Sequence, residues 1–374
     1  MTSFVLLRSY NLLILVSLLV WTYYLGSVVY KSNPFRSFVP LERKGVATIL
    51  GWTSLFEDSI ESIFGSSLAH CPLVDCVVTN NRTMLNKSHA VFFHERDFSR
   101  SDLPHDRFPW QYFVIANWEA PPYLGRTTSS IVDNYFNLTV TYRRSSDIFI
   151  PFFSFDESHD TGKQLQTDDA LMKMAKHKTK FVAWFVSNCN TPSKREYYVK
   201  ELQKHIPVDI YGKCGPLHCP RYSENCSQLL KDDYRFYLAF ENAICLDYTT
   251  EKALTALSND VVPIVLSRSV ARALLQDNSF IAVDDFASPK LLAEFLYKLA
   301  ENPSEYIKFF RFKRKYTATK HELIIKSVCE ICQLISNPQR SSIPRYTKNF
   351  QEWFLRDSNC SSVALPNDTS LHSQ

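Results

Sequence analysis

Glycine is scarce in this chain, and the glycine-rich loops that hold phosphates in two large enzyme classes are missing. Only 8 of the 374 residues are glycine, and neither a G-x-G-x-x-G nor a G-x-x-x-x-G-K-[ST] pattern occurs. The first pattern is typical of dinucleotide-binding folds and the second of P-loop enzymes. The sequence therefore argues against a nicotinamide-dependent dehydrogenase and against a P-loop kinase.

The chain also lacks a strong excess of charge of one sign. Lysine and arginine number 42 against 38 aspartate and glutamate, a formal charge of +4, and no basic run resembles a nucleic-acid-binding arm. We therefore expect no nucleic-acid partner. No Asp-x-Asp triplet occurs, and the adjacent Asp284 and Asp285 are interpreted as a carboxylate pair at a strand end. We expect no metal site, so cations of the chain itself would have to neutralise a bound phosphate.

One long uncharged run is present near the N-terminus. Residues 9–30 contain no charged side chain and are bounded by Arg8 and Lys31. About 20 apolar residues span a bilayer, so this run predicts a single transmembrane signal anchor. Residues 1–8 would form a cytoplasmic tail and 31–45 a short stem. A cleaved signal peptide is the competing interpretation, although its apolar region is usually shorter.

Cysteines and glycosylation sequons indicate a lumenal body. All ten cysteines lie beyond residue 70, an even number that suits an oxidising compartment. Six Asn-x-Ser/Thr sequons follow the apolar run, at Asn81, Asn86, Asn137, Asn225, Asn359 and Asn367. Together these features predict a type II membrane protein with its main part in the lumen.

The stretch 234–252 changes abruptly from apolar to polar. Its first part suits a buried strand, and the residues that follow include Glu241, Asn242, Tyr248, Glu251 and Lys252. Open α/β sheets bind ligands beyond the carboxyl ends of their strands, and a helix N-terminus favours an anion. The stretch therefore predicts a nucleotide site, with ordinary helix capping as the alternative.

This stretch resembles the signature of the α1,3-fucosyltransferase family, which uses GDP-fucose in the Golgi. The resemblance rests on the runs FYLAFEN (236–242) and DY-x-TEK (247–252) and extends over roughly residues 85–335. It implies that Tyr248 lies against the nucleotide, Glu251 on the ribose hydroxyls, and Lys252 on the diphosphate. The same resemblance puts Arg195 on the diphosphate. The spacing before that helix is one residue shorter than in vertebrate relatives, so Lys194 is an alternative.

Two strand ends in the first half match further blocks of this family. His94-Glu95-Arg96-Asp97 resembles its acceptor-selecting motif, with Glu95 in place of a histidine, so that His94 and Arg96 are expected on the acceptor side. Trp118-Glu119-Ala120-Pro121 resembles the block that carries the proposed catalytic base, which is Glu119 here. Ala120 replaces the usual serine. From the residues alone, a carboxylate that follows a strand is a plausible general base but is more often a solvated loop residue.

The alternation of strands and helices after residue 166 predicts a doubly wound, mostly parallel sheet. With a similar first half, we expect two facing Rossmann-like domains, which is the GT-B architecture that the resemblance also implies. The acceptor-side domain would span 46–165, the donor domain 166–340, and a loose tail 341–374. The resemblance further implies that Cys71 and Cys76 pair with Cys329 and Cys332. The remaining cysteines allow up to three more bridges, with their pairing open.

The resemblance predicts an inverting fucosyltransferase that acts on the 3-hydroxyl of N-acetylglucosamine in a glycan. GDP-fucose is the expected donor and no cofactor is required, while stimulation by a divalent cation such as Mn²⁺ stays open. The acceptor is also open between terminal N-acetyllactosamine, its GalNAc analogue and the N-glycan core. A same-fold transferase with another donor, and a catalytically silent lumenal lectin or chaperone, are the alternative functions.

Overall fold

The computed structural model describes residues 46–68, 71, 75–124, 134–157, 167–220, 224–319, 322–336 and 349–364. The predicted cytoplasmic tail, membrane span and stem (1–8, 9–30 and 31–45) lie outside these residues. Within the described ranges, no helix has the length and apolar character needed to cross a bilayer.

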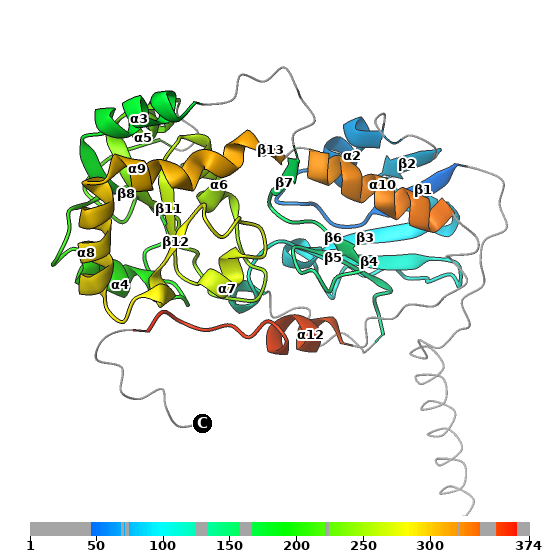
Figure 1. Cartoon of the computed structure of the whole chain (residues 1–374). Coiled ribbons are helices and arrows are strands. Elements are labelled where there is room, and N and C mark those ends of the chain that lie inside the picture. Colours follow the sequence, from blue (N-terminus) through cyan, green and yellow to red (C-terminus); the bar gives the residue numbers. More distant parts are fainter. Residues whose placement is uncertain are drawn as a thin grey trace, which may run out of the picture.

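The first lobe is built on a six-stranded parallel sheet (Figure 1). Its strands are β1 (Ala47–Gly51), β2 (Cys76–Thr79), β3 (Ala90–His94), β4 (Tyr112–Asn117), β5 (Leu138–Thr141) and β6 (Ile148–Phe149). They lie in the order β2-β1-β3-β4-β5-β6, and each neighbouring pair is parallel. All carboxyl ends therefore meet at one edge of the sheet.

The second lobe contains a five-stranded sheet of the same kind. Its strands are β8 (Lys180–Phe185), β9 (Val208–Tyr211), β10 (Tyr234–Leu238), β11 (Val262–Val265) and β12 (Ile281–Ala282). They lie in the order β12-β11-β10-β8-β9, again with parallel pairs only. The order reverses beside β10, which is the kind of position where open α/β sheets bind ligands. Two parallel sheets confirm the predicted α/β class.

Helices cover both sheets, and in the second lobe they alternate with the strands as predicted. The second lobe carries α3 (Asp168–His177), α4 (Arg195–Leu202), α5 (Glu224–Asp233), α6 (Glu251–Ser258), α7 (Arg268–Ala271), α8 (Pro289–Ala300) and α9 (Pro303–Tyr306). The first lobe carries α2 (Ile60–Leu68), α10 (Glu322–Ser336) and, along one edge, α12 (Phe350–Arg356). A two-stranded antiparallel ribbon of β7 (Ser154–Glu157) and β13 (Tyr316–Thr319) lies between the lobes.

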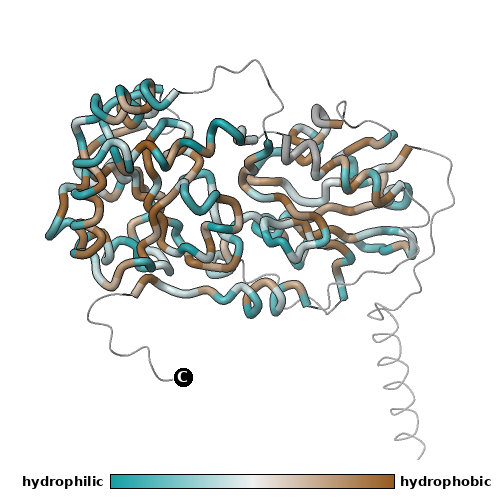
Figure 2. The backbone as a smooth tube through the Cα atoms, in the orientation of Figure 1, coloured by the Kyte–Doolittle hydropathy of each residue, from teal (hydrophilic) through white to brown (hydrophobic). Residues whose placement is uncertain are grey.

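Apolar residues fill both faces of each sheet because buried parallel strands are apolar throughout. Along β3, Ala90 and Phe92 pack in the cluster that includes α2 and α10, whereas Val91 and Phe93 pack in the cluster of the opposite face. Figure 2 shows the strands of both sheets as mostly hydrophobic, with hydrophilic residues on the surrounding helices and loops. The two sheets thus act as rigid supports for the loops at their carboxyl ends.

The domain boundaries differ from the predicted ones at the C-terminal side. Helix α10 was expected in the donor domain, but Val328, Ile331 and Ile335 pack on the first sheet beside α2. The disulfides Cys71–Cys329 and Cys76–Cys332 fix this helix there, as the resemblance implied. The chain therefore returns to the first lobe after completing the second.

Residues 349–364 are also ordered, in contrast to the loose tail expected after residue 340. Phe350 and Phe354 of α12 are buried in the first lobe, and Cys360 is bonded to Cys245 of the second. Farther along, the amide of Val363 donates to the carbonyl of Ser193. We call residues 349–364 the C-terminal clasp, because they connect the two lobes along one edge (Figure 1).

Candidate active site

Glu119 follows β4 at the carboxyl edge of the first sheet. The side chain of Asn117, which is fully buried, accepts from the Glu119 amide at 3.0 Å and donates to its carbonyl at 3.1 Å. This pair of bonds fixes the backbone of the turn, and the Glu119 side chain remains 27% exposed. An anchored backbone with an accessible carboxylate is the geometry that proton transfer to this group needs.

Arg96 and His94 lie at the end of the neighbouring strand β3, but in different environments. The Arg96 guanidinium is exposed, 3.4 Å from the Glu119 carboxylate and 5.6 Å from the Phe56 ring. The His94 imidazole is fully buried, and its Nδ1 is 2.9 Å from Asp97. The structure therefore brings Arg96 to Glu119, while His94 supports the turn from the protein interior through its contact with Asp97.

Burial lowers the pKa of His94, because desolvation of the imidazolium outweighs the hydrogen bond and charge of Asp97. The folded protein thus favours the neutral ring, and stability is fully present above about pH 6.5, the pKa of an unperturbed histidine. It is lost as the pH falls below that value. We expect His94→Asn, which retains a donor to Asp97 but does not titrate, to reduce the fall in melting temperature between pH 7 and pH 5.

The exposed His205 offers a control for this measurement. His205→Asn should leave the pH dependence of the melting temperature as in the unmodified chain. If the melting temperature of His94→Asn falls between pH 7 and pH 5 as much as that of the unmodified chain, groups other than His94 dominate the pH dependence in this interval.

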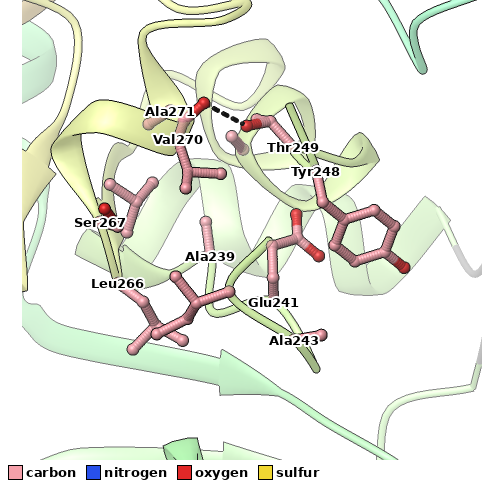
Figure 3. Close-up of a pocket in the computed structure, with 12 residues that line it drawn as sticks. Ala239, Glu241, Ala243, Tyr248, Thr249, Leu266, Ser267, Val270 and Ala271 are labelled. Atoms are coloured by element: carbon pink, nitrogen blue, oxygen red, sulfur yellow. Dashed lines mark hydrogen bonds between the residues drawn. The ribbon is translucent and has the colours of Figure 1, made fainter. Parts of the chain in front are cut away.

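A mostly apolar pocket lies between the end of β10 and α7, and the polar residues after β10 that line it are Glu241, Tyr248 and Thr249 (Figure 3). The Glu241 carboxylate points into it, and Ala239, Tyr248 and Ser267 lie around it. The side chain of Glu251 at the start of α6 is 43% exposed and that of Lys252 is 26% exposed. Asn242 has a buried Oδ1 for which the described residues provide no hydrogen-bond partner. This strand end therefore gathers the donor-side residues that the sequence predicted.

Tyr248, which the resemblance places against the nucleotide, is packed against other residues of the protein. It is only 3% exposed, and its ring packs edge-on against Tyr142 of the first lobe and against Phe152. Burial raises the pKa of its hydroxyl, with Glu241 and Glu119 adding to the effect. Tyr248 therefore joins the two lobes next to the pocket. Contact of its hydroxyl edge with a nucleotide stays a prediction.

Arg195, the expected phosphate ligand, is held by backbone carbonyls. Its guanidinium donates to the carbonyls of Phe240 and Asn188, and the residue is 4% exposed. It thereby links the end of β10 to the loop that follows β8. The preceding residue, Lys194, is exposed and has a left-handed backbone with φ 56° at the start of α4. That Arg195, or the alternative Lys194, binds the diphosphate stays a prediction.

Three disulfides involve the second lobe. Cys189 pairs with Cys214, Cys219 with Cys226, and Cys245 with Cys360. With the two bridges of the first lobe, all ten cysteines are oxidised, which indicates a protein of the secretory pathway. Within the described ranges, no group of three or more His, Cys, Asp or Glu side chains is arranged for a metal ion.

The predicted glycosylation sites fall into two groups. Asn81, Asn86, Asn225 and Asn359 are exposed, while Asn367 lies outside the described residues. Asn137 is only 2% exposed, and its Oδ1 accepts from the Phe113 amide and from Arg107, both at 2.7 Å. A glycan on its amide nitrogen has no room in this core, so the expectation for Asn137 is wrong.

Two residues that hold the site were given no role in it by the sequence analysis. Asn117 and Arg143 act through contacts with backbone or with distant side chains, and only the fold brings these together. A usable signal existed for Asn117 alone, since an asparagine two residues before a candidate base can fix its turn.

The two lobes, each built on a parallel sheet, with a carboxylate at the edge of one and lysines at the edge of the other, form a two-domain α/β fold of the kind found in glycosyltransferases. Two family profiles match the chain: the N-terminal fucosyltransferase profile at residues 44–153, and glycosyltransferase family 10 (fucosyltransferase) C-term at 175–353. The chain belongs to glycosyltransferase family 10, the α-1,3-fucosyltransferases, and is an enzyme of that kind.

Individual relatives agree with this assignment. Alpha-(1,3)-fucosyltransferase C of Drosophila melanogaster is 32% identical over 336 residues, 82% of this chain and 77% of that protein. A mouse 4-galactosyl-N-acetylglucosaminide 3-alpha-L-fucosyltransferase is 32% identical over 314 residues, 82% of each chain. The crystal structure of an alpha1,3-fucosyltransferase with GDP-fucose superposes with a TM-score of 0.50 at 16% identity, over 79% of this chain and 93% of that one. This last likeness concerns the fold.

Proposed function

We propose that this enzyme transfers L-fucose from GDP-β-L-fucose to the 3-hydroxyl of N-acetylglucosamine in a glycan, with inversion at the anomeric carbon. The observation that carries the proposal is the anchored, accessible carboxylate of Glu119 across from the donor-side edge of β10. Glu119 accepts the proton of the acceptor hydroxyl, whose oxygen forms the new bond to fucose as the bond to GDP breaks. The charge of the departing GDP then needs cations.

Lys252 and Lys194 supply these cations in the proposal, because both lie at helix starts on the donor side, Lys252 half-buried and Lys194 exposed. A fixed positive charge beside a leaving diphosphate lowers the barrier without reorganising during the reaction. Glu251 contacts the ribose hydroxyls, Asn242 the base or the ribose, and Arg195 holds the loop that shapes this site. Arg96, which lies beside Glu119, contacts the acceptor sugar.

The acceptor and the location extend the proposal. The mouse relative's name specifies a galactosyl-N-acetylglucosamine acceptor, and we propose an acceptor of this class for the present chain. We place the enzyme in the Golgi membrane, anchored by residues 9–30, with the two lobes in the lumen. In the proposal, lysine side chains of the chain neutralise the diphosphate, and no cofactor takes part in the reaction.

The test uses the full-length chain in detergent with GDP-fucose or GDP-mannose and a panel of three acceptors: galactosyl-N-acetylglucosamine, its GalNAc analogue and the N-glycan core. We expect fucose alone to be transferred, to the first acceptor class, and the product to be α-linked by NMR. A β-linked product would overturn the inverting mechanism. GDP binding without transfer to any acceptor would instead favour a silent glycan-binding protein.

A further inference from the structure

Glu241 has no free oxygen in the structure, although it was expected to contact the donor. Its Oε1 accepts from the amide of Thr250 at 2.7 Å, and its Oε2 accepts from the Thr250 hydroxyl at 3.0 Å and from the Lys252 ammonium at 2.8 Å. The side chain is 11% exposed. Both carboxylate oxygens therefore bind residues at the start of α6.

The two oxygens have separable tasks. Thr250 is the N-cap residue of α6, but its own side chain makes no capping hydrogen bond. Oε1 of Glu241 instead accepts the hydrogen bond of the Thr250 amide. Oε2 instead holds Lys252, whose Nζ also donates to the Thr250 hydroxyl at 2.8 Å. Capping requires one acceptor oxygen, whereas holding the ammonium requires a negative charge.

The surroundings of Lys252 make that charge necessary. Burial by itself lowers the pKa of an ammonium, because it removes water from the charged form. The pKa of Lys252 is nevertheless raised, because Glu241 and Glu251 together outweigh burial and the repulsion from Arg195. Glu251 is 3.8 Å from the ammonium and half exposed, so Glu241 is the closer and better shielded of the two carboxylates.

We propose that Glu241 is a positioning residue that holds the Lys252 ammonium, in its charged state, at the edge where the donor diphosphate binds. This inference rests on the proposed function, in which Lys252 meets the diphosphate. Glu241 itself does not touch the donor. The ammonium donates to Glu241 and to Thr250, and in the proposal its remaining donor meets a phosphate oxygen.

A double-mutant cycle on GDP affinity tests the inference without an acceptor. Calorimetric titration of GDP into the full-length chain is compared for wild type, Glu241→Gln, Lys252→Met and the double variant at pH 6.5 and pH 8.5. Gln retains the oxygen that caps α6 and removes the charge. We expect Lys252→Met to weaken GDP about 10–100-fold, as for loss of a hydrogen bond to a charged group.

Glu241→Gln should weaken GDP about 10-fold at pH 8.5 and less at pH 6.5, because Lys252 then loses its proton at a lower pH. In the Lys252→Met background, the same change should have no further effect. An equal loss in both backgrounds, or a loss that does not change with pH, would show that Glu241 acts through the fold alone and would overturn the inference.

Two further measurements keep the result interpretable. Glu241→Asp keeps the charge but withdraws it by one methylene group, so it should weaken GDP without a new pH dependence, and it replaces Glu241→Gln if that variant does not fold. If Lys252→Met binds GDP like wild type, the proposed diphosphate contact fails, and the inference fails with it. If Lys252→Met weakens GDP but Glu241→Gln does not, the proposed function stands and only the inference is overturned.

Discussion

Replacing Glu119 with glutamine should lower kcat for fucose transfer by about 10²–10⁴-fold, the range that a general base usually contributes. The amide keeps the shape of the side chain and its place beside Arg96, but it cannot accept the acceptor proton at neutral pH. Because the turn is fixed by the Asn117 side chain through backbone atoms, the substitution should leave the fold intact. The measurement is steady-state transfer at saturating GDP-fucose and acceptor.

The affinity for GDP provides the matched readout for this variant. Glu119 lies on the first lobe, at the end of β4, whereas the proposed GDP site lies on the second, so the GDP dissociation constant should stay within about twofold of wild type. Glu301→Gln, at an exposed position on the second lobe, controls for the loss of one carboxylate. Wild-type turnover in Glu119→Gln would exclude this residue as the base. Loss of GDP binding would instead indicate damage to the cleft.

The sheets were predictable because their signal is local. The apolar run 112–116, for example, lies in β4 (Tyr112–Asn117), since a buried parallel strand needs little more than length and apolar character. Helix α3 likewise begins after Thr167, whose hydroxyl caps it. Local composition determined these elements before any tertiary contact was known.

The location of α10 could not be read in the same way. A helix with an apolar stripe can pack on either sheet, and its sequence position directly after the second lobe favoured the wrong one. The cysteines at 329 and 332 held the decisive information, because their partners Cys71 and Cys76 belong to the first lobe. The pairing that the resemblance implied is confirmed, and it holds α10 on the first lobe rather than in the donor domain.

The roles of Arg195 and Glu241 illustrate a second limit. The resemblance implies that Arg195 binds the diphosphate, and Glu241 is expected to face the donor because it belongs to the polar cluster where the strand ends. The structure turns Arg195 toward two backbone carbonyls and Glu241 toward Lys252. A motif specifies that a charge is needed at a site, but only the fold distinguishes the charge that meets the ligand from the charge that holds it.

The clasp residues were missed for a different reason, since their signal was present. Phe350, Trp353 and Phe354 are spaced as one face of a helix, yet two flanking sequons suggested a solvated tail. In the structure, Arg143 of the first lobe binds the end of α12 through the carbonyls of Trp353 and Asp357 and the hydroxyl of Ser358. The disulfide between Cys360 and Cys245 then joins the clasp to the second lobe, three residues before Tyr248.

The clasp should therefore stabilise both the fold and the donor loop, and Phe354→Ala tests this directly. Phe354 is fully buried and packs against Phe350 and Tyr142, in the same cluster as Tyr248. Truncating a buried phenylalanine usually costs about 3–5 kcal/mol, which for a chain of this size lowers the melting temperature by roughly 5–10 °C. Because Tyr248 loses part of its support, we also expect the KM for GDP-fucose to rise several-fold.

The neighbouring Leu355 gives a control on the same helix, since it is 41% exposed. Leu355→Ala should change stability by no more than about 0.5 kcal/mol and leave the KM for GDP-fucose unaltered. If Phe354→Ala lowers the melting temperature but not the affinity for GDP-fucose, the clasp supports the first lobe alone. If both change together while Leu355→Ala resembles wild type, the buried face of α12 is part of what holds the donor loop in place. The Cys245–Cys360 bridge then secures the same loop covalently, so a Cys245→Ser, Cys360→Ser pair should raise the KM in the same direction.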